Sequence, residues 1–214
     1  MSGVATAILI SGRGSNMRAL VEAAKADGFP ARIALVLSNR ADAAGLDFAR
    51  EQGIETLVVS HRDYDSREEF DAVIDAALRE KGIELVCLAG FMRILGAAFV
   101  DSWQDRMINI HPSLLPAFKG LQTHERVLES GVRITGCTVH FVRAQMDDGP
   151  IVAQAAVPVL SGDTPETLAA RVLEAEHTVY PKALALVAGA KVRVVGENVL
   201  ADEIDADCRM MVVG

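Results

Sequence analysis

Short aliphatic runs separated by helical patterns constrain the fold of this chain more than any other feature. Each run is almost continuously apolar, which is typical of parallel strands buried on both faces rather than of strands that face water. An alternation of such strands with helices predicts a doubly wound, mostly parallel α/β sheet. The expected strands of this half are residues 4–10, 32–37, 54–60, 83–89 and 107–110, and the expected helices are 16–26, 42–52, 66–81 and about 96–103.

The pattern changes after Pro112. A short helix is expected first, then two strands joined by a polar loop, which indicates an antiparallel C-terminal part of the sheet. Thr164 and Pro165 have the residue types preferred at a helix start, and Pro181 should end or kink the long helix near Tyr180. The expected elements are a helix at 123–129, strands at 134–142 and 151–159, a helix at 165–180, and a hairpin of 191–195 with 198–200. Little in the acidic tail from Asp202 favours structure, and one domain should span residues 1–214.

The net charge of −8 disfavours duplex DNA and anionic membranes as partners, because both need a cationic surface. Neither the three cysteines nor the five histidines have metal-ligand spacing, so no metal site is expected. An odd cysteine count without a disulfide framework is typical of a reducing compartment. No apolar run reaches the length of a membrane helix, and the N-terminus lacks signal-peptide features. We therefore expect a cytoplasmic protein with small-molecule partners.

A glycine-rich turn joins the first expected strand to the first helix. Gly14 allows close backbone approach to a ligand, and the following helix N-terminus favours an anion. Arg13, Ser15 and Asn16 add charge, hydroxyl and amide donors. The turn lacks the third glycine of a dinucleotide fingerprint and the Gly-Lys-Ser/Thr of a phosphate-binding P-loop. It is either a site for a single phosphate or an ordinary capped turn.

Asn109 and His111 are two residues apart at the end of an expected strand, so their side chains should leave the same face. Pro112 disfavours helix at His111 and keeps it extended. Together with Asp147, an amide, an imidazole and a carboxylate can stabilise an oxyanion and transfer protons. The alternatives are a turn-capping Asn–His pair and a solvated Asp147-Asp148 turn.

Two further segments have a structural and a functional interpretation. Phe91, Met92, Ile94 and Leu95 follow the fourth expected strand, and they either pack in the core or form a slot for a flat organic ring beside Arg93. Glu176 shares the inward face of the long helix with apolar residues and needs a partner, either His177 or an amine ligand. His140 lies in an apolar strand and is expected to be a core histidine.

Four segments of this sequence together resemble the phosphoribosylglycinamide formyltransferases. They are Ile10-Ser11-Gly12-x-Gly14-Ser15-Asn16, Ala89-Gly90-Phe91-Met92-Arg93-Ile94-Leu95, Asn109-Ile110-His111-Pro112-Ser113-Leu114-Leu115-Pro116 and Asp147-x-Gly149-Pro150. The third segment resembles the folate-dependent formyltransferases in general, and the first narrows the resemblance to the glycinamide enzymes. The resemblance covers about residues 4–200. It implies a Rossmann-like formyltransferase fold and a monomer or homodimer.

The resemblance also implies formyl transfer from 10-formyltetrahydrofolate, a co-substrate rather than a bound cofactor, to the amine of phosphoribosylglycinamide in purine biosynthesis. About residues 1–110 would then be a phosphate-binding half, and about 111–200 a folate-binding and catalytic half, before a tail at 201–214. The implied catalytic residues are Asn109, His111 and Asp147; the implied substrate-binding residues are Arg13, Gly14, Ser15, Asn16 and Glu176; the implied folate-binding residues are Arg67, Met92, Arg93, Ile94, Leu95, Asn109, Arg143 and Asp147.

Two residues depart from the family pattern, namely the charged Arg13 in the glycine-rich turn and Asp148 in place of a small residue. A formyltetrahydrofolate hydrolase would not need the phosphate-binding turn, and a non-catalytic nucleotide-sensing module would not need Asn109, His111 and Asp147. An acidic chain does not suit a formyltransferase that acts on methionyl-tRNA. The missing third glycine disfavours an NAD-dependent dehydrogenase.

Overall fold

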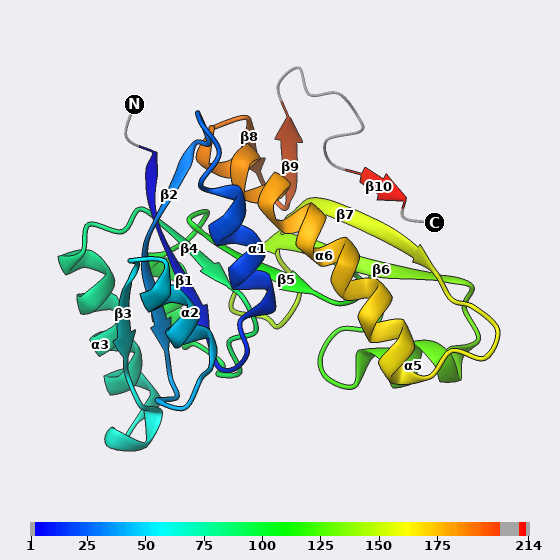
Figure 1. Cartoon of the computed structure of the whole chain (residues 1–214), viewed down its shortest axis with the longest axis horizontal. Coiled ribbons are helices and arrows are strands. Elements are labelled where there is room, and N and C mark those ends of the chain that lie inside the picture. Colours follow the sequence, from blue (N-terminus) through cyan, green and yellow to red (C-terminus); the bar gives the residue numbers. More distant parts are fainter. Residues whose placement is uncertain (1–2, 202–209, 213–214) are drawn as a thin grey trace.

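An eight-stranded sheet forms the centre of the computed structural model, which describes residues 3–201 and 210–212 (Figure 1). Its strands lie in the order β10-β7-β6-β5-β4-β1-β2-β3. A separate antiparallel hairpin consists of β8 and β9. The strands are β1 (Val4–Ile10), β2 (Ala31–Ser38), β3 (Glu55–Val58), β4 (Leu85–Leu88), β5 (Met107–His111), β6 (Ile134–Phe141), β7 (Ile151–Pro158), β8 (Val192–Val195), β9 (Asn198–Ala201) and β10 (Met210–Val212).

The strand directions confirm the predicted mixture of pairing types. Strands β3, β2, β1, β4 and β5 pair in parallel. Strand β6 is antiparallel to both β5 and β7, which gives the sheet its antiparallel C-terminal part. The continuous apolar runs in the first half arise because these strands are covered on both faces.

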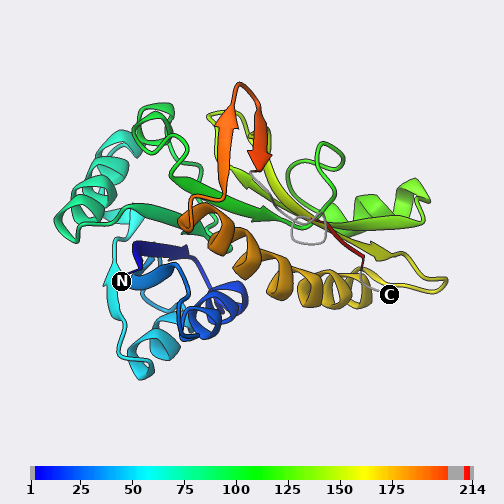
Figure 2. The same ribbon diagram turned by 90° about the horizontal axis from the view of Figure 1, so that it is seen from above.

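Helices cover the two faces of the sheet, as Figure 2 shows from above. The face with α1, α2 and α6 encloses one apolar cluster, to which Leu20, Leu46 and Val172 contribute. The opposite face, with α3 and α4, encloses a second cluster that includes Ile74 and Trp103. The helices are α1 (Ser15–Ala23), α2 (Gly45–Glu51), α3 (Arg67–Glu80), α4 (Ala97–Ser102), α5 (Thr123–Ser130) and α6 (Pro165–Ala188), with a 3₁₀ turn η1 at His61–Asp63. The doubly wound arrangement is therefore confirmed.

The predicted end of the long helix near Tyr180 is wrong. Helix α6 continues through Pro181 to Ala188. A proline inside a helix costs about 3 kcal/mol, because it removes one backbone hydrogen bond and crowds the preceding turn. Burial on both sides of Pro181 offsets this cost, since Tyr180, Ala183 and Leu184 are fully buried.

Part of the acidic tail is ordered by the sheet, contrary to the expectation from sequence. Residues Met210–Val212 form β10, which pairs in parallel with β7 from Gln154 to Ala156. Residues 202–209 and 213–214 of the tail lie outside the described residues. Within the described ranges, no helix is both long and apolar enough to cross a membrane.

Ligand-binding sites in open α/β sheets lie at the carboxyl ends of the strands, where the strand order reverses. Here β1 lies between β2 and β4, so chain connections leave the middle of the sheet in opposite directions. The segments after β1 and β4 meet at this point, where the Ser11 N–H donates to the Gly90 carbonyl (3.1 Å). Strand β5 ends beside them with His111. The fold thus brings the three predicted site segments to one edge.

Candidate active site

The glycine-rich turn after β1 leads directly into α1. Gly14 precedes the helix in the left-handed conformation (φ 69°), and no side chain in the described part of the chain caps the first turn. A side chain at Gly14 would also approach the Cα of Gly45 to 3.2 Å. Ser15 and Asn16 lie in the first turn of α1, and Arg13 is exposed beside them. The local geometry therefore leaves a helix N-terminus open to an anion, as the sequence suggested.

Glu176 of α6 points to this same turn. Its carboxylate accepts a hydrogen bond from the Asn16 amide (2.6 Å), and the residue is only 7% exposed. Of the two partners left open by the sequence, His177 or an amine ligand, the structure shows neither, and Asn16 takes that place. Burial raises the pKa of Glu176 to about 7, an effect that the Asn16 hydrogen bond partly opposes. The Asn16 Oδ1 is buried without a partner among the described residues.

The raised pKa of Glu176 predicts a specific pH dependence of stability. The unfolded carboxyl loses its proton near pH 4.5 and the folded one near pH 7, so the free energy of unfolding falls as the pH rises between these values. The wild-type free energy of unfolding should fall by about 3 kcal/mol over this window. Glu176→Gln has a side chain that resembles the neutral acid and cannot ionise, so this fall should be absent from the variant. Urea unfolding at pH 4.5 and 7.5 measures the difference. Glu51→Gln, at an exposed position of α2, should leave the pH dependence unchanged.

Strand β5 places Asn109 and His111 on one face, opposite two residues of β6. Asn109 pairs with His140, and His111 pairs with Thr138. The loop after β6 brings Asp147 to the same place: its carboxylate lies 3.3 Å from the His111 Nδ1 and 3.8 Å from the His140 Nε2. The structure thus brings together Asn109, His111 and Asp147, and it adds His140 to them.

His140 is not simply a core histidine, as its apolar surroundings had suggested. Its Nδ1 lies 2.9 Å from the Phe141 carbonyl, which can only accept, so this nitrogen carries the proton. Burial lowers the pKa of His140 and favours the neutral ring. The Nε2 of the neutral ring then accepts from the Asn109 amide at 3.2 Å. His140 thereby orients Asn109 and leaves the second amide N–H free for another acceptor.

The His111 ring is oriented in the same way by a backbone group. Its Nε2 lies 3.0 Å from the Phe118 carbonyl and donates to it, so Nδ1 is the nitrogen that faces Asp147. The Asp147 carboxylate in turn accepts from the Gly120 N–H (2.8 Å). His111 is 6% exposed, and the Asp147 side chain is 10% exposed. Such a sheltered carboxylate and imidazole interact more strongly than they would in water.

Sequence reasoning missed the polar residues that support this loop. Thr138 donates to the Ser113 carbonyl (2.7 Å) and accepts from the Leu115 N–H (3.0 Å). Gln154, opposite Thr138 in the sheet, donates to the Leu115 carbonyl (3.0 Å). These contacts fix the backbone that follows His111. The available signal was a polar side chain at each of two otherwise apolar strand positions.

The predicted folate-binding residues come from several segments, of which Met92, Arg93, Ile94 and Leu95 follow β4. Met92 and Ile94 are 71% and 57% exposed, whereas Leu95 is buried. Burial raises the pKa of Asp71, and the Gly96 N–H and then the nearby charges of Arg67 and Arg93 oppose this rise. Arg143 lies apart from them, where it pairs with Asp105 (2.7 Å) and approaches Glu197 to 3.9 Å. Met92 and Ile94 are therefore apolar side chains exposed after β4, whereas Arg143 is already held by carboxylates.

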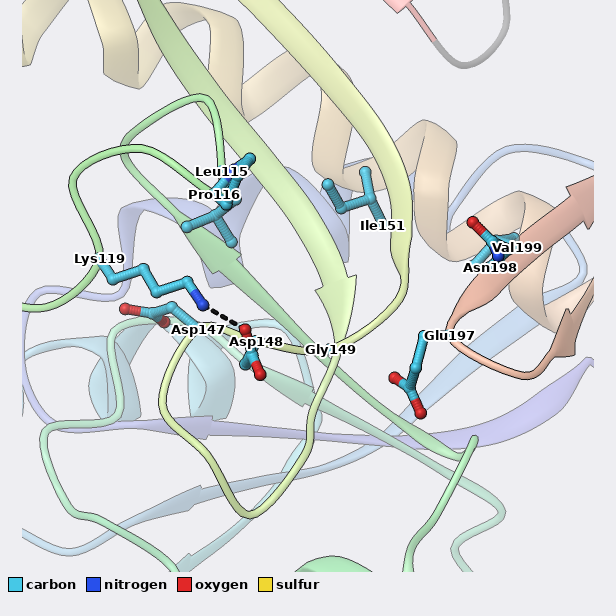
Figure 3. Close-up of a pocket in the computed structure, with 10 residues that line it drawn as sticks. All are labelled: Leu115, Pro116, Lys119, Asp147, Asp148, Gly149, Ile151, Glu197, Asn198 and Val199. Atoms are coloured by element: carbon cyan, nitrogen blue, oxygen red, sulfur yellow. Dashed lines mark hydrogen bonds and ion pairs between the residues drawn. The ribbon is translucent and has the colours of Figure 1, made fainter.

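A hollow of about 430 Å³ adjoins Asp147 on the side of the β8–β9 hairpin (Figure 3). Lys119 and Asp148 form an ion pair on one side of it, and Glu197 faces them from the hairpin. No group of three or more His, Cys, Asp or Glu side chains in the described part of the chain could hold a metal ion.

Comparison with known proteins gives a consistent result. Residues 4–184 match the formyl transferase family. The phosphoribosylglycinamide formyltransferase of Escherichia coli K12 is 45% identical over 174 residues, which cover 81% of this chain and 82% of that protein. The human trifunctional purine biosynthetic protein adenosine-3 is 54% identical over 90% of this chain, which spans only 19% of the human protein's length. The crystal structure of glycinamide ribonucleotide transformylase 1 from Symbiobacterium toebii superposes with a TM-score of 0.91 at 45% identity, covering 93% of this chain and 94% of that one.

Proposed function

Since the chain belongs to the formyl transferase family, we propose that it transfers the formyl group of 10-formyltetrahydrofolate to the amine of phosphoribosylglycinamide, a step of purine biosynthesis. One observation carries the proposal: an open helix N-terminus suited to phosphate lies at the same sheet edge as Asn109, His111 and Asp147. Relatives named phosphoribosylglycinamide formyltransferase support the same substrate pair.

The reaction begins when the neutral amine of the substrate attacks the formyl carbon. The C–N bond forms as the carbonyl oxygen becomes an oxyanion. The free amide N–H of Asn109, oriented by His140, can donate to this oxygen. The His111 Nδ1, when it carries a proton, faces the same space. One such donor contributes about 10²–10³ in rate, because it stabilises charge that exists only in the transition state.

Collapse of the intermediate returns the carbonyl and breaks the bond to the folate N10, which leaves with a proton. That proton comes from the attacking amine, so it must move across the site. Asp147 lies 3.3 Å from the His111 Nδ1 and can relay it directly or through a water molecule. No covalent intermediate with the protein is needed, because the amine itself is the nucleophile.

Binding would divide between the two halves of the sheet. Arg13, Gly14, Ser15 and Asn16 would hold the phosphate, and Glu176 would accept from an N–H of the glycinamide end. The flat ring of the folate would lie against the exposed apolar side chains after β4, and the arginines would lie near the folate tail. The folate contacts in this proposal are Arg67, Met92, Arg93, Ile94, Leu95, Asn109, Arg143 and Asp147.

We further propose that the protein acts in the cytoplasm as a single domain, either monomeric or homodimeric, without a tightly bound cofactor. About residues 1–110 bind the phosphate, and about residues 111–200 bind folate and carry the catalytic residues.

Purified protein mixed with 10-formyltetrahydrofolate, with and without phosphoribosylglycinamide, tests the function by the absorbance change on deformylation. Turnover that requires the glycinamide substrate, with one formylglycinamide product per folate, is the expected result. Equal turnover without it would indicate a formyltetrahydrofolate hydrolase. Folate binding without turnover in either mixture would favour a non-catalytic sensing module.

Arg13→Ala should raise KM for phosphoribosylglycinamide about three- to tenfold and leave kcat nearly unchanged, because a phosphate contact is made equally in the ground and transition states. Initial rates at varied substrate and saturating folate measure both constants. Arg32→Ala, at an exposed arginine at the start of β2 and thus at the opposite end of the sheet, is the matched control. A normal KM for the Arg13 variant would remove the residue from the phosphate site.

A further inference from the structure

Three consecutive residues of the loop after β5 each contact a catalytic residue or its neighbour. The Phe118 carbonyl holds the His111 Nε2 at 3.0 Å, and the Gly120 N–H holds the Asp147 carboxylate at 2.8 Å. Between them, the Lys119 ammonium forms an ion pair with Asp148, the residue after Asp147. The segment 118–120 therefore joins the loop that orients His111 to the loop that carries Asp147.

A residue of α5 also holds the segment 118–120 in place. The Arg126 guanidinium donates to the Lys119 carbonyl (2.6 Å) and lies 5.8 Å from the centre of the Phe118 ring. On the opposite side, Asp148 precedes Gly149, which is buried against the end of β6. Lys119 and Asp148 thus join two anchored segments at the border of the hollow beside Asp147 (Figure 3).

Both joined loops contain residues in a costly backbone conformation. Phe118 (φ 55°) and Asp147 (φ 52°) are left-handed although neither is glycine. Such residues persist only where surrounding contacts hold them. Each lies next to a member of the ion pair, so the pair acts where the two loops most need external support.

We propose that Lys119 and Asp148 are positioning residues for formyl transfer, because their ion pair holds the His111 loop and the Asp147 loop in register. This inference rests on the proposed function, and it assigns a purpose to the acidic residue at 148. Lys119 and Asp148 pair with each other and are not part of the His111–Asp147 contact. They act through the Phe118 carbonyl and the Gly120 N–H, whose positions follow that of Lys119.

The exposure of the pair separates a positioning role from a stabilising one. The Lys119 and Asp148 side chains are 36% and 43% exposed, and exposed ion pairs contribute little to global stability. A displacement of a few tenths of an ångström at His111 or Asp147, however, changes the reaction rate, because the catalytic groups must align with the reacting atoms. Loss of the pair should therefore lower kcat and leave unfolding unchanged.

The test compares Lys119→Gln, Asp148→Asn and the exchanged pair Lys119→Glu with Asp148→Lys. Each single variant should lower kcat about two- to fivefold with little change in KM for either substrate, and the exchanged pair should recover most of the loss. The control is Lys81→Gln, which breaks a Lys81–Glu55 ion pair of similar exposure (38% and 53%) far from the site. It should leave kcat unchanged.

Salt provides a second readout that a general structural role would not affect. The Debye length falls to about 3 Å at 1 M salt, so the wild-type kcat at saturating substrates should fall towards that of the single variants. The variants themselves should respond little. Unchanged kcat in both single variants, or a loss that the exchanged pair does not recover, would overturn the inference.

Nitrogen NMR of the His111 ring reports which ring nitrogen carries the proton. This measurement tests the positioning role of Lys119 and Asp148 separately from the proposed formyl transfer. In the wild type the Nε2 should carry the proton in the neutral ring, and both single variants should show a mixture of the two tautomers. An unchanged tautomer in both would contradict the positioning role whether or not the enzyme turns over. Absent formyl transfer in the wild type, with tautomers that respond as expected, would refute only the proposed function.

Discussion

Replacing His111 with alanine should lower kcat for formyl transfer by about 10²–10⁴-fold while the protein remains folded. The ring is held between the Phe118 carbonyl and Asp147, and in the proposed mechanism its Nδ1 donates to the oxyanion. Alanine removes both a donor to the oxyanion and the group that passes the proton to Asp147. These interactions are made only in the transition state, so KM should change much less than kcat.

Single-turnover measurements at saturating substrates would separate the chemical step from product release. His177→Ala is the control, because it removes a half-buried histidine of α6 whose Nε2 has no hydrogen bond among residues 3–201. A His111→Ala variant with near-normal turnover would exclude the residue from the mechanism. A similar loss in both variants would indicate a general loss of structure.

The alternation of apolar runs and helical patterns sufficed to predict the sheet, because burial on both faces acts on every residue of a parallel strand. The prediction failed at Pro181, where local chemistry opposes the helix but burial of Tyr180 and Leu184 outweighs it. It also failed for Met210–Val212, because pairing with the edge of β7 depends on a strand about 55 residues away and not on local pattern.

For the site, spacing alone could place Asn109 and His111 on one face, since Pro112 fixes the local geometry. The chemistry of the three residue types suggested that Asp147 joins them, but spacing could not place it there, because it lies in a loop that follows another strand. His140 looked like a core residue because Val139 and Phe141 flank it, and its contact with Asn109 depends on the β5–β6 register. The partner of Glu176 lies 160 residues away at Asn16, a contact that neither helix reveals by itself.

Gly149→Ala should reduce kcat by about 10²-fold or more, although it adds a single methyl group. A Cβ at this position would lie 1.7 Å from the Phe141 carbonyl oxygen, so the loop after β6 must move. That loop closes through the hydrogen bond from the Phe141 N–H to the Pro150 carbonyl (2.9 Å), and Asp147 is only two residues away. The Asp147 carboxylate would then lose its contacts with the Gly120 N–H and His111, and the proposed proton relay would be broken.

Gly136→Ala is a matched control, since its Cβ would lie 1.8 Å from the Ala155 carbonyl oxygen within β6, the strand that precedes the Asp147 loop. Both variants should lose about 1–3 kcal/mol of unfolding free energy, because each forces a backbone shift in a close-packed sheet. Rates measured at a temperature where both remain folded should fall only for Gly149→Ala. Equal rates would show that the Asp147 loop tolerates displacement, and catalysis would then not depend on the position of this carboxylate.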